Sequence, residues 1–218
     1  MQKTGGNAGV ALAARRARRI FALLALALFA GAVTSAQPQP ERVAAPVFRW
    51  QPALFRWQYN PAHAPTWLAA DEAQAMVERA VNGWRACAVE IRFEGLTDRV
   101  PGVMDGTNVL GWAPNLAVAQ RGVTTGRTRR DGVIIERDVV VGPEREEFRR
   151  FPRLMQKVLA HEAGHALGLA HAQGCDEVMS SGGNCPMALP VEAPVVPTPG
   201  DLAACAERYG VKSGSWLP

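Results

Sequence analysis

The stretch His161-Glu-Ala-Gly-His165-Ala-Leu-Gly168-Leu-Ala-His171 holds three of the four histidines in this 218-residue chain. On a helix, His161 and His165 are four residues apart and share one face, where two imidazoles can bind the same metal ion. Gly168 can adopt the left-handed conformation that ends a helix, so the chain can turn and bring His171 to that ion. The spacing therefore predicts a metal site made by a helix and the loop that follows it.

The donor set indicates which kind of metal site to expect. Three neutral histidines leave the fourth position of a tetrahedral zinc ion open to water, which is typical of a catalytic zinc site and not of a closed structural one. Glu162 follows the first histidine directly, and it could take a proton from that water and return it to a leaving amine. The residues favour hydrolysis of an amide bond, with one zinc ion as cofactor.

The extended motif resembles that of the metzincin metalloproteases, HExxHxxGxxH followed by a turn that contains a methionine. Met179 lies eight residues after His171, where that turn is expected, and the wording of the motif resembles the matrixin branch. The resemblance implies a zinc endopeptidase in which His161, His165 and His171 bind the ion and Glu162 is the catalytic residue. It also implies that Met179 lies below the zinc without binding it.

The same resemblance implies an α+β fold: a twisted mixed sheet with one antiparallel edge strand, an active-site helix, the methionine turn and a C-terminal helix. Hydrophobic periodicity and turn residues place candidate elements in a compatible order. Strands are expected over 55–59, 89–93, 108–112, 116–123 and 132–141, and helices over 71–86, from Pro152 through the zinc motif, and over 201–210.

A substrate-binding strand is also implied by the resemblance. In metzincins, an extended peptide pairs main chain to main chain with an edge strand above the zinc. Leu116, Ala117, Val118 and Ala119 resemble the wording of that strand in matrixins and are the candidates. An ordinary buried strand would have similar side chains, because the backbone does the binding.

The N-terminus has the pattern of a secretory leader. An arginine-rich start (15–19) precedes an apolar stretch (20–33) that is short for a bilayer span, and small residues follow at 34–36. We expect a signal peptide that is cleaved after Ala36. Cleavage after Ala32, an uncleaved anchor and export by the Sec or the twin-arginine route remain open alternatives.

The rest of the chain fits one enzyme domain of modest size. The expected organisation is a signal peptide over 1–36, a short Pro- and Gln-rich linker over 37–46, a matrixin-like catalytic domain over 47–210 and a tail over 211–218. The linker leaves no room for the cysteine-bearing prodomain that commonly holds matrixins inactive. Control of latency would then come from elsewhere or be absent.

The charge distribution gives no support for nucleic acid or anionic membranes as partners. The whole chain carries +4, but residues 1–36 contain five basic residues and no acid, so the mature chain carries 4 − 5 = −1. We expect a secreted or periplasmic monomer that acts on protein or peptide substrates. No stable association with a membrane is expected after the leader is removed.

Four cysteines in an exported chain are most simply two disulfides, with three possible pairings. We favour Cys175–Cys185, which would close the loop below the metal, and Cys87–Cys205, which would join the first long helix to the last one. Metal binding by Cys175 is the alternative, although three histidines and water already complete a zinc site.

Other functional interpretations stay open at this stage. A hydrolase of cell-wall peptide cross-links would need a wider cleft than an enzyme for extended peptides, and a non-catalytic zinc-binding module would not need Glu162. Calcium sites cannot be read from the sequence, which has no EF-hand-like run of aspartates. The arginines at 121, 127, 129 and 130 could select acidic substrates or could form a solvated hairpin tip.

Overall fold

The computed structural model of the chain describes residues 47–117, 119–181 and 194–210. The expected signal peptide, linker and tail lie outside these residues, and so do Val118 and Cys185, so the predictions about them stay predictions. Within the described ranges, no helix has the length and apolar character needed to cross a membrane.

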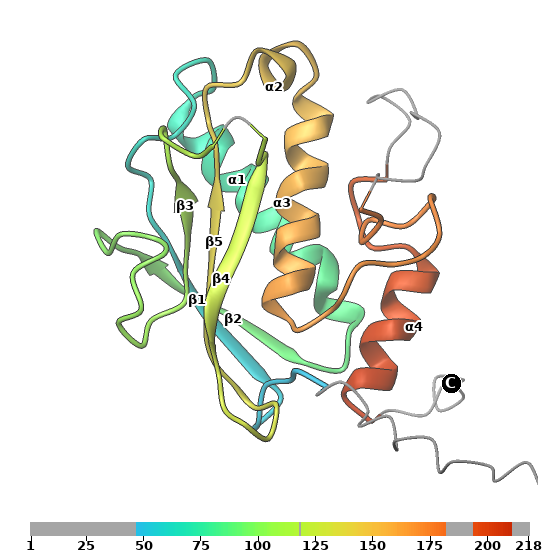
Figure 1. The fold of residues 1–218 in the computed structure, drawn as a ribbon. Coiled ribbons are helices and arrows are strands. Elements are labelled where there is room, and N and C mark those ends of the chain that lie inside the picture. Colours follow the sequence, from blue (N-terminus) through green and yellow to red (C-terminus); the bar gives the residue numbers. More distant parts are fainter. Residues whose placement is uncertain (1–46, 118, 182–193, 211–218) are drawn as a thin grey trace, which may run out of the picture. The chain divides into compact units, whose positions relative to one another are not determined.

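Five strands form one mixed sheet in the order β2-β1-β3-β5-β4 (Figure 1). The strands are β1 (Leu54–Tyr59), β2 (Glu90–Leu96), β3 (Val109–Trp112), β4 (Gly122–Thr128) and β5 (Ile134–Val141). Neighbouring strands from β2 to β5 are parallel, whereas β4 runs antiparallel to β5 at one edge. The expected α+β class, with a mixed sheet and an antiparallel edge strand, is confirmed.

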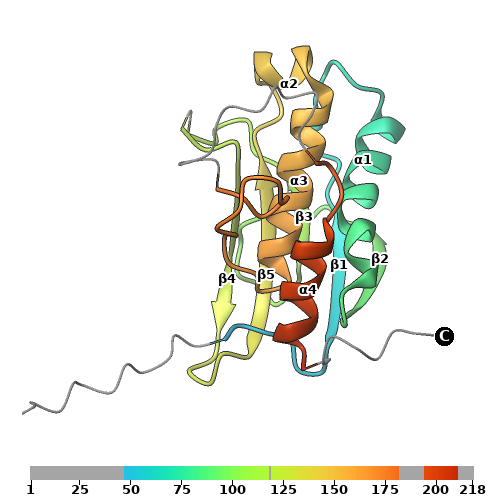
Figure 2. The ribbon, with the colours of Figure 1, turned by 90° about the vertical axis from the view of Figure 1, so that its right-hand side faces the viewer.

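Helices cover one face of this sheet, with α1 and α3 side by side (Figure 2). The helices are α1 (Ala70–Asn82), the 3-10 helix η1 (Gly83–Ala86), α2 (Glu146–Arg150), α3 (Pro152–Ala166) and α4 (Pro199–Arg208). The helix expected over 71–86 is therefore an α-helix that tightens into a 3-10 turn near its end. Proline at the first position of α3 fits its fixed φ and its missing N–H donor.

The core lies between this helical layer and the sheet. Apolar residues at helical spacing on α1 and α3 are buried against alternate residues of β1, which include Phe55, Trp57 and Tyr59. Their neighbour Trp84 donates from Nε1 to the Ala160 carbonyl at 2.9 Å, so the polar edge of this fully buried ring is satisfied. The contact ties η1 to the middle of α3.

The strand expected over 116–123 is wrong: the edge strand begins at Gly122, and the described residues before it form turns. The Leu116 N–H donates to the Ala113 carbonyl at 3.2 Å, which closes a turn. The Ala117 carbonyl then accepts from the Gln120 N–H at 2.8 Å and from the Arg145 guanidinium at 2.9 Å. Backbone groups used in this way are not available for a ladder, so the sheet pairing starts later.

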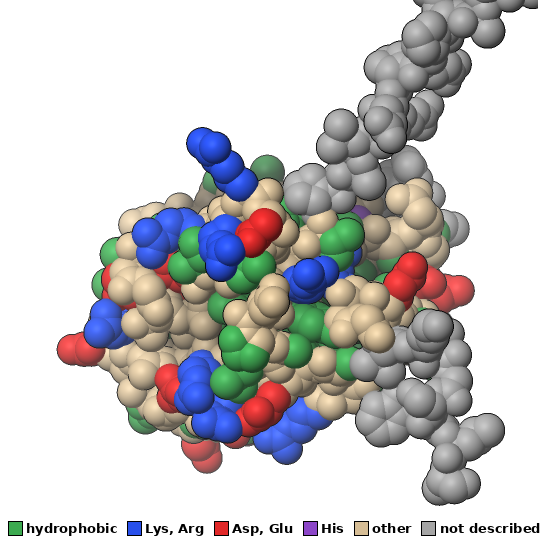
Figure 3. Space-filling model, turned by 90° about the horizontal axis from the view of Figure 1, so that it is seen from below, with side chains coloured by type: hydrophobic (Ala, Val, Ile, Leu, Met, Phe, Trp, Pro, Cys, Tyr) green, Lys and Arg blue, Asp and Glu red, His purple; other side chains and the backbone are tan. Residues whose placement is uncertain are grey.

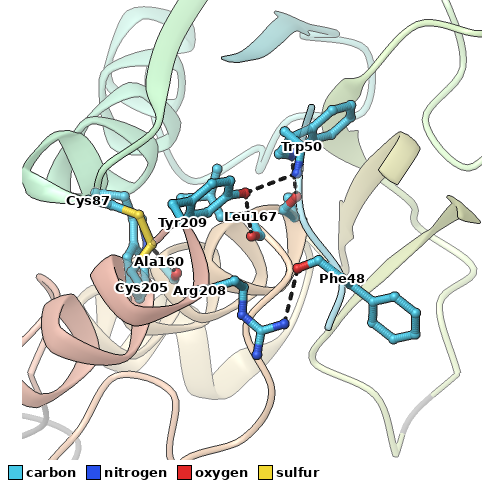
Figure 4. The surroundings of a disulfide bond; sticks show 10 residues. Phe48, Trp50, Cys87, Ala160, Leu167, Cys205, Arg208 and Tyr209 are labelled. Carbon is cyan, nitrogen blue, oxygen red and sulfur yellow. Dashed lines mark hydrogen bonds between the residues drawn. A yellow bond between two sulfur atoms is a disulfide. The ribbon is translucent and has the colours of Figure 1, made fainter. Parts of the chain in front are cut away.

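The last helix is fixed to the rest of the domain at several points (Figure 4). A disulfide joins Cys87 to Cys205, as the sequence favoured, and it is consistent with an exported protein. The Tyr209 hydroxyl donates to the Leu167 carbonyl at 2.8 Å and accepts from the Trp50 N–H at 3.3 Å. The end of α4 is thereby held against the loop that follows α3.

Basic and acidic side chains are interspersed on the face seen from below (Figure 3). Three of the four arginines singled out in the sequence have carboxylate partners: Arg121 pairs with Glu147 at 2.6 Å, Arg127 with Glu136 at 2.8 Å and Arg129 with Asp131 at 2.6 Å. Their charges are largely neutralised within the chain, which favours a structural role over selection of acidic substrates.

Candidate metal centre

The end of α3 is set by a glycine with positive φ. Gly168 has φ of +90°, the Gly168 N–H donates to the His165 carbonyl at 2.9 Å, and the Leu169 N–H donates to the Gly164 carbonyl at 3.0 Å. These bonds satisfy carbonyls at the helix end and reverse the chain. A Cβ atom at residue 168 would clash with the Phe48 carbonyl oxygen, so both the conformation and the space require glycine.

The turn brings the three predicted histidines together. His165 Nε2 lies 3.1 Å from His161 Nε2 and 3.2 Å from His171 Nε2. Three nitrogens that bind one tetrahedral zinc at 2.0–2.1 Å lie about 3.3 Å apart, so these two distances fit such an ion, and all three nitrogens lie within 4.8 Å of one another. Within the described part of the chain, this is the cluster of His, Cys, Asp or Glu side chains that could hold a metal ion.

Two backbone carbonyls decide which ring nitrogen is available for a metal. His161 Nδ1 lies 2.8 Å from the Val178 carbonyl, and His165 Nδ1 lies 2.8 Å from the Leu169 carbonyl. A carbonyl only accepts, so each Nδ1 must carry the proton and each Nε2 must present its lone pair. These lone pairs point at one another at close range, an arrangement that a bound cation stabilises.

The pKa values of the three histidines also indicate neutral rings that could bind a metal ion. Burial lowers the pKa of His161 to about 4, and the neighbouring His165 and His171 add to this, while the hydrogen bond to Val178 opposes it. Burial also lowers the pKa of His165. The pKa of His171 is lowered by burial and by the neighbouring His165. Neutral imidazoles are the form that binds zinc.

The methionine turn lies against the same helix. Met179 is 2% exposed, and its Sδ packs so closely on Gly164 that a Cβ atom there would clash with it. Gly164 lies between the two helical histidines, and the Trp84 ring covers the same spot, with a carbon 2.7 Å from the position of such a Cβ. The glycine inside the motif is thus explained by close packing rather than by its φ.

A buried carboxylate that the sequence analysis did not single out holds this turn. Asp201 is 2% exposed and accepts from the Val178 N–H at 2.9 Å and from the Met179 N–H at 3.1 Å. It also accepts from the backbone N–H and the hydroxyl of Thr198, both at 2.9 Å. The spacing from Thr198 to Asp201 ahead of an alanine-rich segment is close to a capping box, which is the signal that could have identified it.

Glu162 lies beside the histidines and packs against β4. It is 7% exposed, and the Thr124 hydroxyl lies 2.7 Å from Glu162 Oε2 and 2.9 Å from the Glu162 carbonyl. Burial raises the pKa of Glu162, whereas the hydrogen bond from Thr124 and the field of His171 lower it. A Cβ atom at Gly122 would lie 2.8 Å from Glu162 Cγ, so this glycine lets β4 approach the helix.

The described residues that were predicted to bind substrate or to form a disulfide near the metal lie outside the histidine cluster. Leu116, Ala117 and Ala119 lie in the connection between β3 and β4, before the edge strand. The described cysteines have no free thiol, and the Cys175–Cys185 pairing stays a prediction because Cys185 lies outside the described residues. The structure thus brings the three histidines and Met179 together and places Glu162 beside them.

Comparisons with known proteins give a distant match in fold only. Among solved structures, archaemetzincin (AmzA) from Methanopyrus kandleri is 16% identical with a TM-score of 0.44, covering 72% of this chain and 96% of that one. The GM1-bound form of the ECX AB5 holotoxin is 14% identical with a TM-score of 0.45, covering 72% and 80%. No family model matches the chain, and no curated protein matches it. Similarity at this level does not carry an activity from one protein to another, so the function must be inferred from the site.

Replacing Gly168 with alanine is expected to lower the free energy of unfolding by more than about 2 kcal/mol, because it adds a clash to an unfavourable φ. Gly210→Ala is the matched control: Gly210 has φ of +78° with no described atom near the added Cβ, so a loss of about 1 kcal/mol is expected. Chemical denaturation of both variants at a fixed zinc concentration measures the difference. Equal losses of unfolding free energy in the two variants would show that the clash with the Phe48 carbonyl oxygen adds nothing to the cost of the positive φ.

Replacing Asp201 with asparagine is expected to weaken zinc binding by about 10- to 100-fold, because the amide cannot accept from both N–H groups that hold the turn. Competition with a chelating dye measures the zinc affinity. Glu207→Gln on the same helix is exposed and is expected to leave it unchanged. Unaltered affinity in the Asp201 variant would show that the turn holds its position without the carboxylate.

Proposed function

We propose that this chain is a zinc-dependent endopeptidase of metzincin type, with a matrixin-like arrangement. The observation that carries the proposal is the convergence of three Nε2 lone pairs, two of them fixed by hydrogen bonds to carbonyls, beside a buried carboxylate. The matrixin-like form is supported by the wording of the zinc motif and by the position of Met179 in the sequence.

His161, His165 and His171 would hold the zinc through Nε2. When bound, zinc supplies a Lewis acid that polarises a carbonyl and makes water more acidic. The hydrogen bonds from Nδ1 to the Val178 and Leu169 carbonyls orient two of the rings and increase the basicity of their Nε2 atoms. We expect one zinc ion for each chain.

Glu162 is the proposed general base and acid. Thr124 holds Oε2, while Oε1 has no hydrogen-bond partner among the described residues and can accept a proton from an attacking water. Burial raises the pKa of Glu162, which suits a group that takes a proton from water and then returns it to the leaving amine. Burial also limits competition from bulk water at this carboxylate.

The edge strand β4 is the proposed site for the substrate backbone. In the described part of the chain, β4 pairs with β5 on one side only, so its other edge can accept an extended peptide. Thr124 belongs to this strand and contacts Glu162, so a peptide on the edge would lie next to the base. The residues proposed for this role are therefore those of β4 and not Leu116 to Ala119.

We further propose that the enzyme works outside the cytoplasm, as a monomer, on protein or peptide substrates. The Cys87–Cys205 disulfide and the leader-like N-terminal sequence support export. The same proposal includes cleavage of the leader after Ala36 and a final location in either the periplasm or the external medium.

Glu162→Gln tests the proposal. The wild type is expected to cleave internal bonds in a diverse library of unfolded peptides, and the variant is expected to lose about 10²- to 10⁴-fold in kcat while keeping its zinc, because only the proton acceptor is removed. Mass spectrometry identifies the cleaved bonds, and elemental analysis gives the zinc content. A zinc-loaded wild type that cleaves no peptide would contradict the endopeptidase and would favour a zinc-binding module or a branched cell-wall substrate.

Thr124→Val is expected to lower kcat about 10-fold with unchanged zinc content, because the isosteric side chain cannot donate to Glu162 Oε2. The neighbouring Thr125→Val is the control, since the buried Thr125 hydroxyl has no hydrogen-bond partner among the described residues. Steady-state kinetics on one cleavable peptide compares the two. Equal activity of both variants would remove Thr124 from the proposed positioning of the base.

A further inference from the structure

A basic stripe on α3 leads to the histidine cluster. Arg153, Lys157 and His161 follow one another at intervals of four residues, so their side chains share one face of the helix. Arg153 is exposed, whereas Lys157 is partly buried and lies one turn before His161. Residues four apart on a helix are neighbours on its surface, and the positive charge of Lys157 adds to the lowering of the pKa of His161.

The ammonium group of Lys157 has no counter-ion among the residues that the structure describes. Among the described residues it forms no ion pair, in contrast to the three arginines near β4 that are paired with acids. Asp201 is the acid whose field reaches Lys157, but hydrogen bonds from the methionine turn and from Thr198 already occupy both of its oxygens. A partly buried ammonium group without a partner attracts a carboxylate from outside the chain.

The direction of a bound peptide follows from the arrangement of β4 and α3. Gly122 lies against Val158 and Glu162, and Thr124 contacts Glu162, so the two elements run in the same direction at this point (Figure 2). A peptide that pairs antiparallel with β4 then runs from the Glu162 level toward the start of α3. Residues on the carboxyl side of the scissile bond therefore approach Lys157.

The position along the peptide follows from helix and strand geometry. One helical turn between His161 and Lys157 is about 6 Å, which corresponds to about two residues of an extended strand at about 3.3 Å each. The side chains that can reach Lys157 are thus those of the first and second residues after the scissile bond.

We propose that Lys157 is a specificity-determining residue that selects peptides with aspartate or glutamate at the first or second position after the scissile bond. This inference rests on the proposed endopeptidase function and names a substrate class for it. The ammonium group contacts the substrate carboxylate and takes no part in the chemistry at the scissile bond.

Fluorogenic peptides that differ only at these two positions, with Glu, Gln or Lys, test the inference on the zinc-loaded enzyme. The wild type is expected to show kcat/KM about 10-fold higher for Glu than for Gln and lowest for Lys. Lys157→Gln should cleave the Glu and Gln peptides equally well, and Lys157→Glu should prefer Lys. Arg153→Glu, one turn farther from the histidines, is the matched control and should keep the wild-type order.

A second measurement separates binding from chemistry. In the inactive Glu162→Gln background, anisotropy of labelled peptides is expected to show the same order of affinity, and adding Lys157→Glu is expected to reverse it. Cleavage by the wild type without preference for Glu, or an unchanged preference in both Lys157 variants, would overturn the role of Lys157 and leave the endopeptidase intact. Absence of cleavage for every peptide by the zinc-loaded wild type would overturn the endopeptidase itself.

Discussion

The hydrogen bond from His161 Nδ1 to the Val178 carbonyl is the contact that joins the two halves of the site. His161 belongs to α3, whereas Val178 belongs to a loop whose position depends on Asp201 at the start of α4. A metal ligand must keep both its tautomer and its ring orientation, because zinc binding tolerates only small errors in geometry. The helix therefore provides the histidine, but a segment far along the chain determines how the imidazole ring is oriented.

This dependence explains why α4 is held at several points although it contributes none of the three histidines. Its start carries Asp201, its middle is bonded through Cys205 to the end of η1, and its end is fixed through Tyr209 to the loop after α3. Each attachment limits a different movement of the helix. Together they restrict the methionine turn, which would otherwise be a surface loop with few constraints.

The clustering of the three histidines could be predicted because one short motif contains all of them and the glycine that reverses the chain. The spacing of the histidines along the helix and the conformation of Gly168 were sufficient to predict that their side chains meet. The start of the edge strand was not predictable in the same way, since Leu116 to Val123 has strand-like composition. The turns at this point are stabilised by Arg145, which lies more than twenty residues later in the chain. Thr124 and Asp201 were missed for a related reason, because their roles come from tertiary contacts with Glu162 and with the methionine turn.

The approach of β4 to α3 would link the proposed binding of a peptide to the position of Glu162, the proposed base. A glycine at residue 122 allows the strand to touch the Glu162 side chain, and Thr124 then donates to the same carboxylate two residues later. Any larger side chain at residue 122 would push the strand away from the helix and lengthen that hydrogen bond. A peptide added to the outer edge of β4 is consequently placed relative to Glu162 by the sheet itself. In the proposed enzyme, the edge strand would position both the peptide and Glu162, and catalysis would depend on the register of β4 against α3.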